Sequence, residues 1–179
     1  MGRLQNQNVS SSDRRPQDNK ITLPRSLSIV LYQPRIPQNT GSIARMCAAT
    51  GSKLDLINPL FKLDEKKLIR AGLDYWPLLD VFLFDSWDDW LQQRKTIPWM
   101  AEVNAPQSYT SVPYQPNDYI MFGDEQEGVP QALLEKYTEK HIGIPQQGVR
   151  SLNLATSVGI VSYEAYRQLD WLHIPVPKI

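Results

Sequence analysis

The sequence predicts an α/β domain with a mostly parallel sheet and helices on both faces. From Leu27 to Leu172, short apolar runs of strand length alternate with longer stretches of helical periodicity, which is the pattern of a parallel sheet. The chain has 179 residues, and 41% of them are hydrophobic, which is enough for one domain with its own core. No apolar run approaches the roughly 18–20 residues that a membrane-spanning helix needs.

Short apolar runs mark the expected strands. The clearest is Leu-Ser-Ile-Val-Leu-Tyr at residues 27–32, where apolar side chains follow one another as in a buried strand. In chain order, the expected strands are residues 27–32, 54–57, 81–84, 99–103, 119–122 and 142–144.

Helical periodicity and end signals mark the expected helices. In the first, Asn39 or Thr40 caps the N-terminus and Gly51 stops the C-terminus. Ser86 caps the third, and Pro130 lies in the first turn of the fourth. In order, the expected helices are residues 41–49, 63–71, 87–93, 130–137 and 152–172.

Charge is unevenly distributed along a chain whose net charge is zero. Residues 1–25 carry five basic and two acidic side chains, a net charge of +3, so the rest of the chain sums to −3. We expect these polar residues to form a flexible N-terminal extension before a single domain at residues 26–179. The extension is either only solvated or a basic arm that contacts RNA. The zero net charge counts against binding of nucleic acid by charge alone.

Cysteine, histidine and motif content exclude several classes of site. Cys47 is the only cysteine, so neither an intrachain disulfide nor a cysteine zinc site is available, as is typical of a cytoplasmic protein. His141 and His173 are too few for a histidine-rich metal site, and we expect no bound metal. The sequence has no GxGxxG after a strand, no Walker A loop and no GxSxG elbow.

Three polar segments follow strands at the sheet edge where α/β proteins bind ligands. Ligands lie beyond the carboxyl ends of parallel strands, so a site is expected in the loops after Tyr32, Val103, Phe122 and Ile144. In order, the three segments are residues 37–45, 122–130 and 144–155.

The first two segments combine glycine, charge and a helix start. The first either binds an anion at a helix N-terminus or is a well-capped helix with Arg45 on its surface. In the second, Gly123 lets a ligand approach the backbone, while three carboxylates in four residues repel one another unless something compensates them. Glu125 is expected to be held by backbone N–H groups or by Arg45. The alternative is an ordinary acidic loop.

The third segment leads into the last helix through Ser151, Leu152 and Asn153. Serine and asparagine are common N-cap residues, so capping accounts for them without any function. The helix that follows has a face of small residues, including Ala155 and Gly159, which suits close packing against another segment or another subunit.

Taken in order, these segments resemble the three motifs of the SPOUT class of RNA methyltransferases, and most of all the TrmL-type tRNA (cytidine/uridine) 2′-O-methyltransferases. The stretches that carry the likeness are IPQNTGSIARMCAATG, IMFGDEQEGVP and RSLNLATSVGIVSYEAYRQL. The resemblance implies a C-terminal trefoil knot, S-adenosylmethionine as cofactor, tRNA as substrate, and a homodimer that uses the first and last helices with Tyr163 and Glu164 near its interface.

The resemblance also implies which residues form the site. The residues that would contact the cofactor, largely through the backbone, are Ala101, Gly123, Ile144, Ser151 and Leu152. The residues implied in catalysis are Asn39, Arg45, Glu125, Ser151 and Asn153.

The implied chemistry aligns a ribose hydroxyl with the methyl group of a sulfonium and removes a proton, without a metal. A guanidinium is effectively never deprotonated, so Arg45 is expected to clamp a phosphate and stabilise the developing alkoxide rather than act as a base. Ser151 and Asn153 would orient the hydroxyl and the ribose. Glu125 would hold Arg45 or the loop of Ser151.

This chain departs from the resemblance in two places. Asn104-Ala105-Pro106 stand where many relatives have a Lys-Gly pair, and Glu127 stands where relatives often have a basic residue. Both departures remove positive charge near the expected RNA entrance. The alternative functions are methylation of a ribosomal RNA ribose or another tRNA position, and RNA binding by a dimer without activity. The presence of Asn39, Arg45, Glu125 and Ser151 argues against the inactive dimer.

Overall fold

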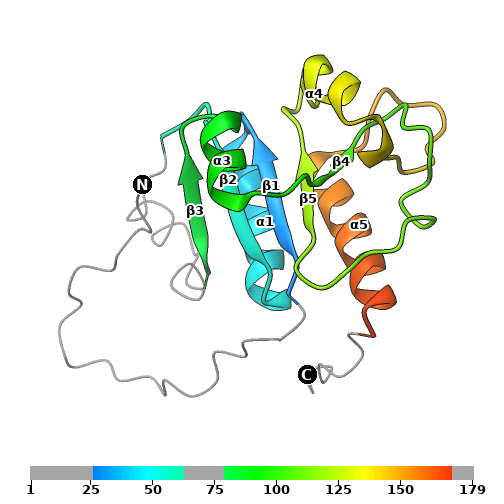
Figure 1. Ribbon diagram of the computed structural model, residues 1–179, viewed down its shortest axis with the longest axis horizontal. Coiled ribbons are helices and arrows are strands. Elements are labelled where there is room, and N and C mark those ends of the chain that lie inside the picture. Colours follow the sequence, from blue (N-terminus) through cyan, green and yellow to red (C-terminus); the bar gives the residue numbers. More distant parts are fainter. Residues whose placement is uncertain (1–25, 63–78, 171–179) are drawn as a thin grey trace.

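A six-stranded parallel sheet forms the centre of this computed structural model, which describes residues 26–62 and 79–170 (Figure 1). The strand order is β3-β2-β1-β5-β4-β6 and every neighbouring pair is parallel, so all the carboxyl ends lie at one edge. All six strands predicted from the apolar runs are present. They are β1 (Ser28–Tyr32), β2 (Lys53–Ile57), β3 (Val81–Phe84), β4 (Trp99–Ala101), β5 (Tyr119–Phe122) and β6 (His141–Ile142).

Two strands end earlier than expected. β4 stops at Ala101 instead of residue 103, and β6 stops at Ile142 instead of residue 144. The reason is that the chain after β6 pairs with the loop between β4 and β5 rather than with β4 itself: Gly143 donates its N–H to the carbonyl of Gln107 at 2.9 Å. The expected extension at residues 1–25 and the expected helix at residues 63–71 lie outside the described residues.

Helices cover both faces of the sheet, as predicted (Figure 1). α1 (Pro37–Thr50) and α5 (Leu154–Gln168) pack on one face, where Ile43 and Val158 join the larger apolar cluster. α3 (Trp87–Arg94) and α4 (Gln131–Lys136) pack on the other, where Trp90 and Leu134 join a second cluster. The 3-10 turn Thr138–Lys140 follows α4.

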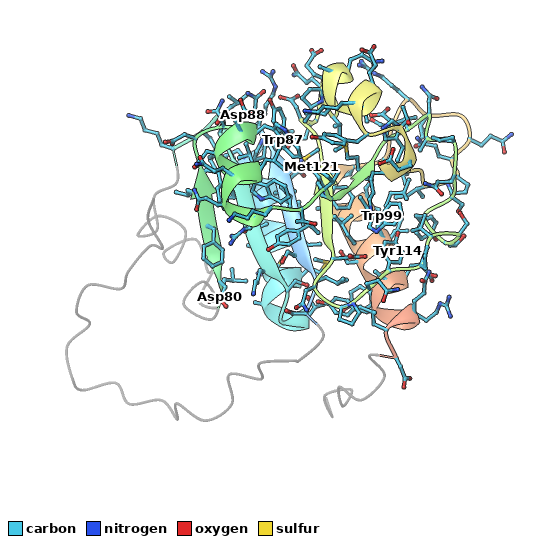
Figure 2. All side chains as sticks on the ribbon, in the orientation of Figure 1. Asp80, Trp87, Asp88, Trp99, Tyr114 and Met121 are labelled. Atoms are coloured by element: carbon cyan, nitrogen blue, oxygen red, sulfur yellow. The ribbon has the colours of Figure 1, made fainter. Side chains whose placement is uncertain are left out.

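Side chains fill the space on both sides of the central strands (Figure 2). Met121 of β5 is fully buried in the second cluster. Trp87 stacks on Trp90 with the ring centroids 5.2 Å apart. Trp99 meets Tyr114 edge to face at 6.3 Å, which fixes the loop before β5 against the sheet.

The predicted helix ends are only partly correct. α1 begins at Pro37 and its N-cap is Ile36 without a side-chain cap, so the prediction that Asn39 or Thr40 caps it is wrong. Proline suits the first helical position because its φ is preset and it lacks an N–H. At the other end, Gly51 stops α1 with a φ of 69°, as predicted. Asn153 caps α5, which therefore starts two residues later than expected.

Cys47 is fully buried against the sheet, and burial raises the pKa of its thiol, so the thiol stays protonated and is no nucleophile. Among the residues of the two described ranges, no helix is both long and apolar enough to cross a bilayer. The same part of the chain holds no group of three histidine, cysteine or carboxylate side chains that could bind a metal ion.

A buried ion pair joins α3 to the sheet. Asp55 of β2 is fully buried, and its carboxylate accepts hydrogen bonds from Arg94 at 2.7 and 2.8 Å and from Nε1 of Trp90 at 2.8 Å. The guanidinium of Arg94 also lies over the rings of Phe82 and Phe84, 4.5 and 4.9 Å from their centroids. The pair is thus enclosed by aromatic side chains and fully hydrogen-bonded on the carboxylate side.

Replacing Arg94 by methionine is expected to lower the free energy of unfolding by roughly 2–4 kcal/mol, because Asp55 would be left buried without its cation. We place the loss towards the lower end of the range for buried pairs, since 20% of the Arg94 side chain is exposed. Thermal unfolding should show a fall of roughly 5–15 °C. The double variant Asp55→Asn with Arg94→Met should recover part of the loss. An Arg94→Met variant as stable as the parent would contradict a stabilising role for the ion pair.

Candidate functional site

A cavity of about 470 Å³ opens at the carboxyl edge of the sheet. Its walls come from the loops after β1, β4, β5 and β6 and from the start of α5. These are the loops in which the strand pattern predicted a site. The volume is within the range of small-molecule sites, about 300–1,000 Å³.

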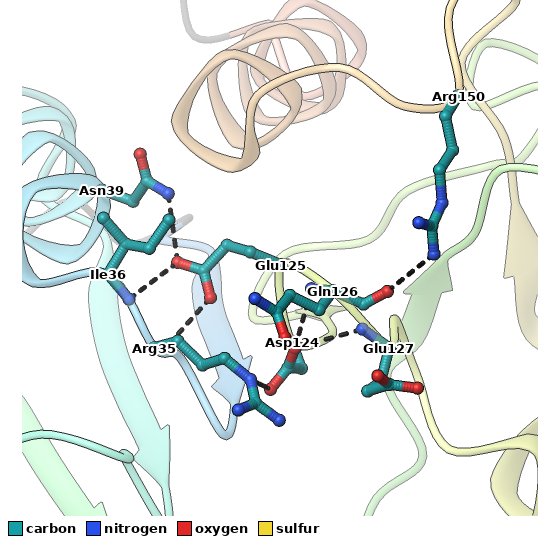
Figure 3. Close-up of polar contacts among 8 residues, drawn as sticks. All are labelled: Arg35, Ile36, Asn39, Asp124, Glu125, Gln126, Glu127 and Arg150. Atoms are coloured by element: carbon teal, nitrogen blue, oxygen red, sulfur yellow. Dashed lines mark hydrogen bonds and ion pairs between the residues drawn. The ribbon is translucent and has the colours of Figure 1, made fainter.

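Asp124 ties the loop after β5 to itself and to the loop after β1 (Figure 3). Its Oδ1 accepts from the backbone N–H groups of Gln126 at 2.7 Å and Glu127 at 3.1 Å. Its Oδ2 forms an ion pair with Nε of Arg35. Only 5% of Asp124 is exposed, and its three N–H partners compensate the burial of its charge.

Glu125 holds the start of α1 (Figure 3). Its carboxylate accepts from the backbone N–H groups of Arg35 at 2.8 Å and Ile36 at 3.2 Å, and from Nδ2 of Asn39 at 3.0 Å. A helix N-terminus favours such a negative charge. Of the two kinds of partner expected for Glu125, backbone N–H groups are the kind observed here.

A chain of amide hydrogen bonds continues from α1 to α5. Asn39, which donates to Glu125, accepts through Oδ1 from Nδ2 of Asn153 at 3.0 Å. Asn153 in turn accepts from the backbone N–H of Thr156 at 3.2 Å and so caps α5. Asn153 therefore both caps α5 and belongs to the site. Three segments that are far apart in the sequence are fixed relative to one another at the cavity wall.

The segment before α5 forms a further wall. Arg150 donates from a terminal amino group to the carbonyl of Gln126 at 3.1 Å, which links this segment to the loop after β5 (Figure 3). Ser151 is exposed and Leu152 half-buried, and both line the cavity. Gln146 also lines it, and its buried amide oxygen has no hydrogen-bond partner in the described part of the chain.

Gly123 is required by a close approach between two stretches of backbone. A Cβ atom at this position would lie 1.9 Å from the carbonyl carbon of Gly128 and 2.2 Å from the nitrogen of Val129. Two backbone hydrogen bonds between Asp124 and Gly128, at 2.9 and 3.1 Å, hold the approach. The sequence interpretation expected a ligand to approach the backbone at Gly123. The chain's own loop makes a close approach there, and Gly123 also lines the cavity, so the expected contact with a ligand stays a prediction.

Most of the residues predicted for the site line this one cavity. They are Asn39, Ala101, Gly123, Glu125, Ile144, Ser151, Leu152 and Asn153. Arg45 is the exception, because it is exposed on α1 and is not among the lining residues. Six residues after Asn39, it lies about 9 Å further along the helix axis and roughly 120° around it.

The sequence interpretation missed Arg35 and the structural role of Asp124. A signal was present, since the crowded carboxylates at residues 124–127 call for a nearby cation. The pattern does not say which basic residue supplies it, because Arg35 lies 89 residues before Asp124 in the chain. Only the parallel pairing of β1 with β5 brings the two loops together.

Comparisons with known proteins agree with this arrangement. The SpoU rRNA Methylase family model matches residues 26–163. The chain is 42% identical over 154 residues to a tRNA (cytidine(34)-2′-O)-methyltransferase of Yersinia pestis, with 81% of this chain and 95% of that protein covered. For the enzyme of the same name from Escherichia coli (strain K12), the identity is 41% over 149 residues, with 81% and 95% covered.

The fold comparison leads to the same group of proteins. A solved structure from work on the 2-OH methylation of C/U34 on tRNA superimposes with a TM-score of 0.76 at 45% sequence identity. The match covers 83% of this chain and 99% of that chain.

Proposed function

Because the chain belongs to the SpoU rRNA methylase family, we propose that it transfers a methyl group from S-adenosylmethionine to a ribose 2′-hydroxyl of tRNA, at the cytidine or uridine of position 34. The observation that carries the proposal is the hydrogen-bonded chain that Glu125, Asn39 and Asn153 form along the wall of the cavity. The named relatives supply the target nucleotide.

The cavity suits the methyl donor in its shape and charge. Its walls combine backbone at Gly123 with apolar side chains such as Ile144 and Leu152, which accommodate a planar base. The unpaired amide oxygen of Gln146 needs a hydrogen-bond donor, which the amine and hydroxyl groups of a nucleoside provide. S-adenosylmethionine supplies an electrophilic methyl group on a positively charged sulfur, and the carboxylates around the cavity, including Glu102, favour a cation there.

The chain's own residues then have two tasks, positioning and charge stabilisation. We assign the hydroxyl of Ser151 and the amide of Asn153 to orienting the ribose, because both line the cavity at the start of α5. Asn39 fixes Asn153, and Glu125 fixes Asn39, so Glu125 acts on the reaction through this chain rather than by contact with the substrate.

Arg45 is assigned to the RNA rather than to the methyl donor. It is exposed on α1 beyond the cavity, where a guanidinium binds a phosphate in two-pronged geometry and stabilises negative charge as it develops on the ribose oxygen. A permanently charged guanidinium is suited to this task and unsuited to removing a proton.

We further propose that the protein acts in the cytoplasm as a homodimer that packs through α1 and α5. Gly159 of α5 faces open space, since a Cβ atom there would meet nothing within 4 Å, and Tyr163, one turn later, is 51% exposed. A solution mass of 20.5 kDa, that of one chain, would contradict the dimer. The trefoil knot expected at the C-terminal end stays a prediction.

Incubation of the purified protein with bulk tRNA and S-adenosylmethionine labelled in the methyl group tests the function. We expect label in 2′-O-methylcytidine or 2′-O-methyluridine at position 34. A tRNA with a 2′-deoxy nucleotide at that position is the matched control and should accept no label. Label in ribosomal RNA but not in tRNA would move the target to the ribosome, and label in neither would contradict the enzymatic assignment.

A further inference from the structure

Arg35 lies beside the cavity with most of its hydrogen-bonding capacity unused. Its guanidinium uses only Nε, which pairs with Asp124, and the dashed line in Figure 3 joins only Nε to that carboxylate. Neither amino group has a partner among the described residues, and 40% of the side chain is exposed. A guanidinium has five N–H donors, so four of them remain for a ligand.

The rim of the cavity carries more negative than positive charge. Among the lining residues, Arg150 is the only cation, while the carboxylates are Glu102, Asp124, Glu125 and Glu127. An RNA strand brings one negative charge with every phosphate, and a rim of this sign repels it. Arg35 is a second guanidinium at the same edge, because it contacts two of the lining carboxylates directly.

Both the backbone and the side chain of Arg35 are held in place. Its N–H donates to Glu125 at 2.8 Å, and its Nε is anchored on Asp124, a carboxylate that two backbone N–H groups fix in turn. The anchor leaves the terminal amino groups as a fork that matches two phosphate oxygens. A side chain that is fixed before binding loses less conformational entropy when the ligand arrives.

We propose that Arg35 binds a phosphate of the RNA strand whose ribose enters the cavity, with Asp124 as the positioning residue that orients it. The inference rests on the proposed function and adds to it a residue that recognises the substrate backbone. The same arrangement explains how a chain without net positive charge holds RNA at this site, since one anchored guanidinium acts where the phosphate lies.

Binding of tRNA to the Arg35→Met variant tests the proposal. We would measure fluorescence anisotropy of labelled tRNA with S-adenosylhomocysteine present, over a series of KCl concentrations. The Kd for tRNA should rise about tenfold. The slope of log affinity against log salt should fall by roughly 0.7–0.9, the value for one lost phosphate contact. The Kd for S-adenosylhomocysteine, measured by calorimetry, should stay within about twofold.

Two further variants separate the contact from a folding effect. Arg35→Lys keeps the charge but not the fork, so it should retain the parental salt slope with a smaller loss of affinity. Lys53→Met removes an exposed cation at the opposite, amino end of β2 and should change neither quantity.

The possible failures are distinguishable. A parental salt slope in Arg35→Met would overturn the phosphate contact while the methyl-transfer function stands. Parallel loss of S-adenosylhomocysteine affinity in both Arg35 variants would show a structural role instead. If the parent protein transfers no methyl group to tRNA, the proposed function fails first and this inference with it.

Discussion

Replacing Arg45 by alanine is expected to lower the rate of methyl transfer to tRNA by about 100- to 1,000-fold, the usual loss when one group that stabilises developing negative charge is removed. Because Arg45 lies on α1 outside the residues that line the cavity, the Kd for S-adenosylhomocysteine should stay within about twofold. Single-turnover methylation measures the first quantity and calorimetry the second.

Two controls sharpen this test. Arg45→Lys keeps the positive charge and loses the two-pronged geometry, so it should recover only part of the rate. Lys53→Ala removes an exposed cation from the amino end of β2, opposite the cavity, and should leave the rate unchanged. Loss of cofactor-product affinity in Arg45→Ala would contradict the assignment of Arg45 to the RNA.

Replacing Gly123 by alanine is expected to abolish detectable binding of S-adenosylhomocysteine, and with it methyl transfer. The added Cβ would lie 1.9 Å from the carbonyl carbon of Gly128 and 2.2 Å from its oxygen, and no side-chain rotation relieves a clash with backbone. The two hydrogen bonds between Asp124 and Gly128 must then break. The displaced loop carries Asp124 and Glu125, so the ion pair with Arg35 and the hydrogen bonds to the start of α1 are lost together.

Gly148→Ala is the matched control for this substitution. A Cβ atom at Gly148 would meet nothing within 4 Å, although the φ of +77° is unfavourable for alanine. We expect a loss of roughly 1–2 kcal/mol in the free energy of unfolding and a Kd within about threefold of the parent. If Gly123→Ala bound S-adenosylhomocysteine with parental affinity, the loop after β5 would be free to move, and the contact between Gly123 and Gly128 would not shape the cavity.

Local sequence patterns were sufficient to predict an element wherever its formation depends on residue type or on residues a few positions away in the chain. The apolar run of β1 became a buried strand because its apolar side chains gain by leaving water, whichever elements cover them. Ser86 caps α3 through the N–H of Asp89, and Gly51 ends α1, because both signals act within a few residues. β4 and β6 ended early because a distant loop took the backbone groups of Gly143.

The residues of the candidate site could be predicted from the sequence, but the hydrogen bonds that join them could not. The resemblance of three segments to a known family named Asn39, Glu125 and Asn153, and these residues line one cavity. That Glu125 would bond to the start of α1, and Asn39 to Asn153, depended on how the loops meet in space. The hydrogen bond from Asn153 to Asn39 spans 114 residues of sequence, a separation at which no local pattern carries information.

By itself, the sequence determined the α/β class, the strands and the edge of the sheet at which a site would form, because hydrophobic periodicity and parallel connections act locally and leave few alternatives. The tertiary structure alone decided which carboxylate holds the start of α1, which cation compensates Asp124, and that Arg45 lies apart from the cavity. Each of these depends on the distance between charges or hydrogen-bonding groups, and only the pairing of β1 with β5 brings residues 35 and 124 within reach of each other.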